Sequence, residues 1–248
     1  MSAEKMSLYH PLSKKPYHIL AKPGDIAPRV VAMGDPGRVK SSMKLLEDAR
    51  IVNEYRGYIV VTGKYKGVDV SLATHGIGAP SAAIVFEELL MLGAKAIVRA
   101  GTCGALQKEL GVGTVFVVEG AAYEPGGTLG QYVGSTCYPA VPTPELVVEL
   151  EKAAKELGLK VARGLTLSHD AFHRVEYHSK RWVELGIGIL EMECAILFTL
   201  SKLRGFKAGG MALVVDNMVT GEELVEGKKD LEVKMVKAAL EAITRIEV

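Results

Sequence analysis

The stretch VVAMGDPGRVK, residues 30–40, decides how this chain begins to fold. Its first four residues are apolar without polar alternation, which predicts a strand covered on both faces. Gly-Asp-Pro-Gly then predicts a turn, and the arginine that follows, Arg38, opens a predicted helix. A cation there faces the unfavourable end of the helix dipole, where a carboxylate or phosphate would be favoured. The stretch therefore predicts a strand–turn–helix unit with an anion close to Arg38.

The same alternation of apolar runs and helical patterns continues outward from this stretch and predicts the fold class. It indicates an α/β fold with a mixed, mostly parallel central sheet flanked by helices. We expect a single domain over residues 1–248, in which residues 1–16 form a peripheral N-terminal segment. Strands are expected at residues 29–33, 58–62, 68–74, 96–100, 114–119, 161–167 and 208–215, and helices at 36–46, 81–92, 144–157, 193–203 and 229–243.

Two connecting segments carry information of their own. TGKYKG, residues 62–67, lies between two strand runs and predicts a β-hairpin, which is why the sheet is expected to be mixed. Residues 120–142 contain glycines and prolines with little apolar periodicity. They predict a long excursion of the kind that serves function or an interface.

Composition excludes several classes of protein. Among 248 residues, 30 Lys and Arg nearly balance 29 Asp and Glu, and no basic stripe is visible, so nucleic acid is not an expected partner. The three cysteines form neither a zinc pattern nor a disulfide framework, and we expect reduced thiols in a cytoplasmic protein. The N-terminus lacks the apolar core of a signal peptide, and no apolar run approaches the about 20 residues that span a bilayer, so no membrane is expected.

Small and polar clusters follow the predicted strands. In open α/β sheets, ligands bind beyond the carboxyl ends of the strands, so we expect these clusters to converge on one site. None of their glycines belongs to a Walker loop or a G-x-G-x-x-G motif, so they indicate either tight turns alone or backbone N–H groups that face an anion. The clusters are GDPGR (34–38), THGIGAPS (74–81), GTCG (101–104), SHDAF (168–172) and DN (216–217).

Arginines suggest what the anion meets. Arg99 lies inside an apolar run, where an unpaired charge is costly. Together, Arg38, Arg56 and Arg99 would form a bidentate cradle for an oxyanion such as phosphate, with the Thr102 hydroxyl as a further donor. The alternatives are a surface position for Arg56 and, for Arg99, a buried ion pair with an acidic residue such as Glu87, Glu88 or Glu193.

Carboxyl and aromatic side chains suggest an organic ligand. Glu191 and Glu193 interrupt an apolar stretch that enters a helix, where they would either cap the helix or accept hydrogen bonds from sugar hydroxyls. Asp216 directly follows a buried apolar run. It would serve either as a turn residue or as an acid whose pKa is raised by burial. Phe172 would either pack in the core or stack on a base. For His18, the sequence alone indicates an incidental surface histidine. The remaining histidines show no metal spacing, and no metal is expected.

These motifs in this order resemble the nucleoside phosphorylase family, which includes hexameric purine nucleoside phosphorylases, methylthioadenosine phosphorylases and uridine phosphorylases. The resemblance runs from about residue 18 to the C-terminal helix. It depends on the combination of GDPGR, THGIGAPS, RAGTCG, EMEC and VVDN. It implies that this chain cleaves a nucleoside with inorganic phosphate as co-substrate and with no organic cofactor.

The resemblance also implies a role for individual residues. Asp216 would protonate N7 of a departing purine and Arg99 would position the phosphate, which makes these two the catalytic pair. A homo-oligomer is implied, a hexamer built as a trimer of dimers, in which His18 and Arg56 reach into a neighbouring subunit. Phosphate would be held by Gly34, Arg38, Arg56, Arg99 and Thr102, ribose by His18, Met192 and Glu193, and the base by Cys103, Gly104, Phe172 and Asp216.

The base is the open question. Uridine-acting relatives carry a glutamine and an arginine shortly after the aromatic, where this chain has Glu176 and His178, and this difference favours a purine. Arg174 lies close enough to keep uridine as the alternative. A methylthio group at the ribose 5′ position, as in methylthioadenosine, is also open. A nucleosidase, which uses water, would not need three arginines, and a non-catalytic nucleoside-binding protein would not need an acid at the base.

Overall fold

In the computed structural model, which describes residues 15–177 and 179–248, the opening stretch forms strand β1 (Arg29–Met33) and helix α2 (Pro36–Ser42). Asp35 starts the helix because its Oδ1 accepts a 2.7 Å hydrogen bond from the backbone N–H of Gly37. Pro36 takes the first helical position, where its missing N–H costs nothing. A 3₁₀ turn (Met43–Leu45) ends this segment. The predicted strand–turn–helix unit is therefore confirmed.

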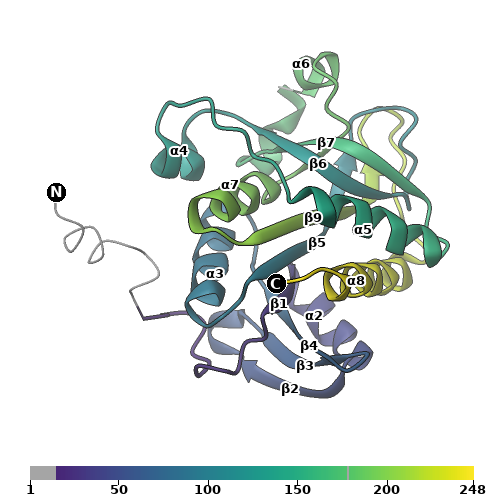
Figure 1. The fold of residues 1–248 in the computed structure, drawn as a ribbon. Coiled ribbons are helices and arrows are strands. Elements are labelled where there is room, and N and C mark those ends of the chain that lie inside the picture. Colours follow the sequence, from purple (N-terminus) through teal and green to yellow (C-terminus); the bar gives the residue numbers. More distant parts are fainter. Residues whose placement is uncertain (1–14, 178) are drawn as a thin grey trace.

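The sheet is mixed, as expected, and the strands run in the order β2-β3-β4-β1-β5-β8-β7-β6-β9 (Figure 1). Its centre is parallel, because β1 pairs in parallel with β4 and β5, and β5 pairs in parallel with β9. Since β9 also pairs with β6, five strands close on themselves. Besides β1, the strands are β2 (Glu47–Asn53), β3 (Val60–Tyr65), β4 (Val68–Thr74), β5 (Ala96–Ala105), β6 (Val115–Tyr123), β7 (Val161–Ser168), β8 (Ile189–Glu191) and β9 (Lys207–Asn217).

Helices cover both faces of the sheet. Figure 1 shows α5 (Pro144–Glu156) and α8 (Lys228–Arg245) side by side, apart from α3 (Ala79–Met91) and α7 (Cys194–Arg204). Successive β1 residues face the two sides in turn: Val30 and Ala32 pack in the cluster with α3 and α7, and Val31 and Met33 in the cluster with α5 and α8. A strand buried on both faces needs apolar residues at every position, which explains the run VVAM.

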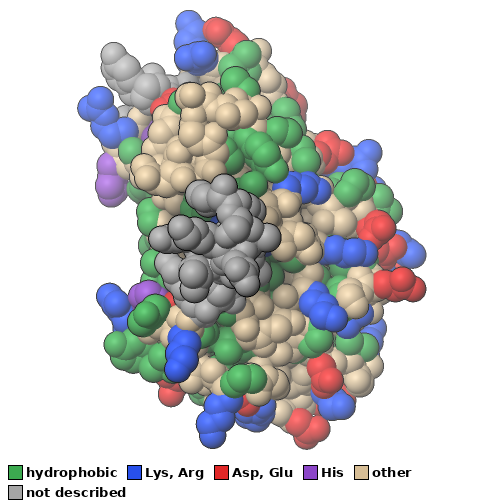
Figure 2. Space-filling model, turned by 60° about the vertical axis from the view of Figure 1, so that its left-hand side comes forward, with side chains coloured by type: hydrophobic (Ala, Val, Ile, Leu, Met, Phe, Trp, Pro, Cys, Tyr) green, Lys and Arg blue, Asp and Glu red, His purple; other side chains and the backbone are tan. Residues whose placement is uncertain are grey.

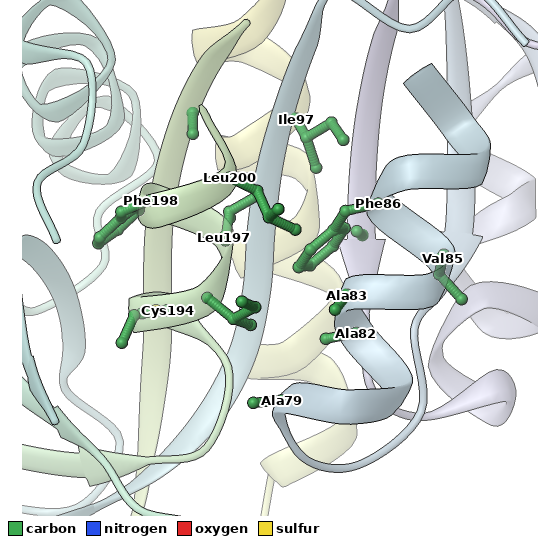
Figure 3. Packing of buried hydrophobic residues seen from close by; sticks show 14 of the residues in the cluster. Ala79, Ala82, Ala83, Val85, Phe86, Ile97, Cys194, Leu197, Phe198 and Leu200 are labelled. Carbon is green, nitrogen blue, oxygen red and sulfur yellow. The ribbon is translucent and has the colours of Figure 1, made fainter. Parts of the chain in front are cut away.

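Helices α3 and α7 pack closely because α3 presents small alanine side chains at their contact. Figure 3 shows Phe86 and the alanines Ala82 and Ala83 of α3 turned toward Leu197 and Leu200 of α7. All five side chains are buried or nearly so. The alanines leave space that the larger side chains fill, so the two helices that begin within THGIGAPS and EMEC are held in fixed positions.

Several element bounds differ from the sequence prediction. β5 continues through GTCG to Ala105, and β9 continues through the DN cluster to Asn217, because the two strands pair with each other along their whole length. Residues that were expected after these strands therefore lie on them. The sequence prediction also missed β2, β8, α4 (Gly127–Val133), which lies inside the expected excursion, and α6 (Ser179–Glu184).

The expected hairpin is present between β3 and β4. The two strands pair antiparallel up to Tyr65 and Val68, and the two residues between them, Lys66 and Gly67, both have positive φ. This is the backbone of a two-residue turn whose twist matches that of the strands.

The surface shows no sign of a polyanion-binding face on the side drawn in Figure 2, where Lys and Arg are interspersed with Asp and Glu. In the described part of the chain, no helix is long and apolar enough to cross a bilayer. The cysteines Cys103, Cys137 and Cys194 are all unpaired.

Candidate active site

A cavity of about 960 Å³ opens where the polar clusters meet, along the carboxyl-terminal parts of β1, β4, β5, β8 and β9. Every one of the five clusters contributes at least one residue, so the expected convergence is confirmed. The lining comprises Gly34, Asp35, Pro36, Arg38, Gly76, Ile77, Arg99, Gly101, Thr102, Cys103, Gly104, His169, Phe172, His173, Leu190, Glu191, Met192, Glu193, Val215, Asp216 and Met218.

Arg38 reaches the cavity from the first turn of α2 and is 6% exposed. Its Nη2 donates a 2.8 Å hydrogen bond to Glu232 Oε1 on α8, and its Nη1 donates a 3.3 Å bond to the carbonyl of Ala100. Its Nε is buried and makes no hydrogen bond with the described residues. One edge of the guanidinium is thus fixed, and a donor remains.

Arg99 lies on β5 and is tied to two carboxylates. Its Nη2 donates to Glu193, and its Nη1 lies 3.4 Å from Glu191 Oε2. The ion pair with Glu193 that the sequence left open is therefore present, whereas Glu87 and Glu88 pair elsewhere. Burial opposes the charge, but the two carboxylates prevail and raise the pKa of Arg99 above its ordinary value. Nε and Nη1 of Arg99 make no hydrogen bond within the described chain.

Glycine at position 101 makes room for this guanidinium. A Cβ at Gly101 would collide with the guanidinium of Arg99, which folds over the strand at that point. Arg99 can take this position only because residue 101 has no side chain, so its guanidinium lies directly over the backbone of Gly101. Two such guanidiniums, with Thr102 on the same cavity wall, can bind an oxyanion through charge-assisted hydrogen bonds.

The two glutamates of EMEC have separate roles. Glu191 Oε2 accepts hydrogen bonds from the backbone N–H groups of Glu193, at 2.8 Å, and Cys194, at 2.9 Å, so it caps the start of α7. Ser168 donates to its other oxygen. Glu193 Oε1 instead accepts a 2.7 Å bond from the N–H of Gly78. Burial raises the pKa of Glu193, but the Arg99 guanidinium and the N–H of Gly78 outweigh it and lower the pKa, which keeps this carboxylate charged.

His75, in THGIGAPS, does not line the cavity but lies within electrostatic range of Glu193 and Arg99, and the sequence did not single it out. It is fully buried, and its ring nitrogens make no hydrogen bond with the described residues. Burial lowers its pKa to about 4, against the opposing effect of Glu193, so the ring is neutral at neutral pH. The available signal was its position: a histidine directly after a buried strand, beside a glycine turn.

Asp216 lies on β9 and faces the cavity. It is opposite Gly104 of β5, and a Cβ at that glycine would lie 2.9 Å from Asp216 Oδ2, so the glycine makes space for the carboxyl group. Burial and then the Glu223 carboxylate raise the pKa of Asp216, and Lys228 opposes them. The turn role is taken by Asn217, whose Oδ1 accepts bonds from Val219 and Thr220. This environment favours the protonated form of Asp216 more than water does.

The remaining cavity residues suit a flat organic group. Phe172 is 70% exposed and lines the cavity, so it is not a core residue. Met192 lies between this cavity and a second one of about 500 Å³, lined by Ile77, Gly78, Pro80, Gly127, Thr128, Gln131, Asp170 and Met192. Burial raises the pKa of the Cys103 thiol well above its ordinary value, so it offers contact and not a nucleophile.

Two expected site residues do not line the cavity of this chain. The Nδ1 of His18 lies 2.8 Å from Glu88 Oε1. Arg56 is exposed on a 3₁₀ turn (Tyr55–Gly57), which matches the surface alternative within one chain. His178 lies outside the described residues, and the side chain of Glu176 is likewise not described. No group of three or more metal-ligating side chains occurs within residues 15–177 and 179–248.

Comparison with known proteins gives one consistent result. A family model described as "Phosphorylase superfamily" matches residues 28–246. The chain is 36% identical over 244 residues to a guanosine phosphorylase of Halorubrum lacusprofundi, covering 95% of this chain and all of the relative. It is 37% identical over 228 residues to a uridine phosphorylase of Thermococcus kodakarensis, covering 86% of this chain and 82% of the relative.

Two further matches cover nearly the whole length of both chains. A DeoD-type purine nucleoside phosphorylase of Caldanaerobacter subterraneus is 37% identical over 228 residues, 90% of this chain and 98% of the relative. The crystal structure of a uridine phosphorylase from Vibrio fischeri superimposes with a TM-score of 0.85 at 30% identity, over 94% of this chain and 98% of the other.

Proposed function

This chain belongs to the phosphorylase superfamily, and from that premise we propose that it is a nucleoside phosphorylase whose preferred substrates are purine nucleosides, including 5′-methylthioadenosine. It transfers the pentosyl group from the base to inorganic phosphate. The products are a free base and ribose 1-phosphate or its deoxy form.

On the phosphate side of the reaction, the protein contributes mainly by holding phosphate and ribose in the correct relative position. A phosphate oxygen attacks the anomeric carbon, the bond to the base nitrogen breaks, and its electron pair leaves with the base. Gly34, Arg38, Arg99 and Thr102 hold the phosphate, while Met192 and Glu193 hold the ribose. Fixing the two reactants in one cavity removes most of the entropic cost of their encounter. When substrates bind, Glu193 would accept hydrogen bonds from the sugar hydroxyls. Arg99 would then donate to the phosphate some of the hydrogen bonds that it now donates to Glu193.

The base side of the reaction needs a proton, because the departing purine gathers negative charge. Asp216 donates to N7, and general acid help of this kind is worth roughly 10²- to 10⁴-fold in rate. An ordinary aspartate would be ionised at neutral pH. Burial and Glu223 raise the pKa of Asp216, the direction that a donor requires. This carboxyl group, in the same cavity as two buried arginines, is the observation that carries the proposal.

Uridine is the second candidate because a uridine phosphorylase is among the relatives at similar identity. In this chain Arg174, which would read uracil, is exposed on the 3₁₀ turn Phe172–Tyr177 and is not among the residues that line the cavity. A nucleosidase and a non-catalytic binding protein fit less well, since neither explains both the arginines and the acid.

We further propose a homo-oligomer, a hexamer of three dimers, in the cytoplasm, with a role in nucleoside salvage and no organic cofactor. Within one chain, His18 and Arg56 lie outside the cavity lining. An interface that brings a neighbour's His18 to the ribose and its Arg56 to the phosphate would complete the site.

The test is base release from adenosine, guanosine, inosine, methylthioadenosine and uridine, measured side by side with and without phosphate. We expect release that requires phosphate and is at least tenfold faster in kcat/KM for the best purine than for uridine. Release without phosphate would indicate a nucleosidase, and binding without release would indicate a binding protein. A preference for uridine would overturn the assignment of the base.

A further inference from the structure

The last helix of the chain contacts the phosphate side of the cavity through one buried ion pair. Glu232 in α8 accepts the 2.8 Å hydrogen bond from Arg38 Nη2, across 194 positions of sequence. Arg38 is 6% exposed and Glu232 is 8% exposed. Arg38 lines the cavity and Glu232 does not, so the carboxylate acts on the guanidinium from behind.

We propose that Glu232 is a positioning residue for phosphate, which fixes the Arg38 guanidinium so that its remaining donors serve the oxyanion. The inference rests on the proposed phosphate role of Arg38. The guanidinium has five N–H donors in a rigid plane, so holding one nitrogen fixes the orientation of the others. The bond to Glu232 and the weaker bond from Nη1 to the Ala100 carbonyl leave Nε without a partner in the described chain.

The carboxylate has two opposite effects on phosphate binding. It orients the guanidinium, which favours binding, and its negative charge competes with the phosphate, which disfavours it. A purely electrostatic view predicts tighter phosphate binding whenever Glu232 is neutralised. A positioning role predicts weaker binding only when the hydrogen bond is lost, so variants can separate the two effects.

Three substitutions of Glu232 separate the effect of the hydrogen bond from the effect of the charge. Glu232→Gln keeps an oxygen acceptor at the same reach and removes the charge. Glu232→Asp keeps the charge and shortens the reach by one methylene. Glu232→Ala removes both. We expect kcat/KM for phosphate to fall about tenfold in the Asp and Ala variants and to stay within about threefold of wild type in the Gln variant, while KM for the nucleoside is unchanged.

Glu241 offers a matched control on the same helix. It is also 8% exposed, and its carboxylate accepts a 2.7 Å bond from Tyr65 and a 2.8 Å bond from Lys66, away from the cavity. Glu241→Ala should lower the thermal midpoint about as much as Glu232→Ala and leave kcat/KM for phosphate unchanged. If the Ala variant at Glu232 does not fold, the Asp and Gln variants still give opposite expectations.

A double-mutant comparison tests whether the effect passes through Arg38. In an Arg38→Ala background, which should itself bind phosphate poorly, Glu232→Asp should cause no further loss. The proposal is overturned if the Asp variant matches wild type, if the Gln variant loses as much as the Asp variant, or if the loss persists without Arg38. If Arg38→Ala leaves phosphate kinetics unchanged, the assignment of Arg38 is wrong, while phosphate-dependent base release still tests the function separately.

Discussion

At the scale of single residues, burial and an opposing carboxylate together raise the pKa of Asp216. Asp216 and Glu223 form an isolated antiparallel pair, flanked by the bond from Asn217 N to Glu222 O at 2.9 Å and the bond from Leu224 N to Val215 O at 2.8 Å. Residues paired in this way lie directly opposite, with their side chains on the same face. Glu223 thus disfavours the charged form of Asp216, after burial itself, while Lys228 favours it and Cys103 lies within the same electrostatic environment.

Removal of this opposing charge should weaken the acid. In Glu223→Gln the pKa of Asp216 falls, so at neutral pH a smaller fraction of enzyme carries the proton. Activity is lost as pH rises through the pKa of Asp216, and this limb of the pH profile should move to lower pH. We expect a loss of about two- to fivefold in kcat/KM for purine nucleosides at neutral pH, the size of a like-charge cross-strand pair. The measurement is kcat/KM against pH.

A neighbouring residue and an altered substrate control this experiment. Glu222→Gln removes a charge one position away that does not contribute to the pKa shift of Asp216, and it should leave the profile unchanged. 7-Methylguanosine already carries a positive base that needs no proton to depart, so its cleavage should be insensitive to Glu223→Gln. An equal loss with both substrates would mean that Glu223 acts on something other than the acid.

At the scale of elements, β5 is the strand on which the site depends. It was expected to end at residue 100, and it continues to Ala105 because β9 supplies a hydrogen-bonding partner along its whole length. Arg99, Thr102 and Gly104 therefore come from one continuous strand, whose pairing with β9 shifts register between Cys103 and Gly104. Sites on strands are held more accurately than sites on loops, because each backbone group is already fixed by its neighbour.

A single methyl group on this strand should disturb the phosphate site. In Gly101→Ala the new Cβ meets the guanidinium of Arg99 and displaces it. We expect KM for phosphate to rise roughly ten- to a hundredfold, the cost of a charge-assisted hydrogen bond, with a smaller change in KM for the nucleoside. Gly111→Ala is the control, since its nearest neighbour would be Lys160 Nζ at 3.5 Å, an ordinary contact. Unchanged phosphate kinetics in Gly101→Ala would show that Arg99 does not bind phosphate.

At the scale of the whole molecule, one chain forms a cavity without two of the expected site residues. His18 is held by Glu88, and Arg56 lies on an exposed turn. The aromatic and aliphatic side chains of Tyr17, Leu20 and Tyr55 near them in sequence are at least half exposed. A complete site from two subunits would explain both observations.

Mixed assemblies test a shared site. Arg56→Ala and Asp216→Asn should each be nearly inactive alone. If every site combines Asp216 of one subunit with Arg56 of another, then co-expressed variants restore about a quarter of wild-type activity when pairing is random, because half of the pairs are mixed and one of their two sites is intact. Asp216→Asn with Arg99→Ala should restore nothing, since both residues belong to the same subunit. Activity no greater than the sum of the separate variants would contradict the shared site.

The sequence by itself determined the fold class and which polar clusters meet at the cavity. Unbroken apolar runs such as residues 30–33 require cover on both faces, and Asp35, Pro36 and Gly37 determine where a strand turns into a helix. These signals are local, within a few residues of chain. The polar clusters could be assigned to one site because parallel strands present their carboxyl ends at the same edge of a sheet.

Only the tertiary structure decided which charges meet. The partner of Arg38 lies 194 positions away, and nothing in the local sequence separates Glu232 from other glutamates on helices. For Arg99, the sequence left Glu193 as one of three candidate partners, and the fold selected it across 94 positions. Strand closure through β9 and the opposition of Asp216 and Glu223 are likewise products of pairing between distant segments. The physical reason is that backbone propensity and hydrophobic period act over a few residues, whereas electrostatic pairing acts through space, after the chain has packed.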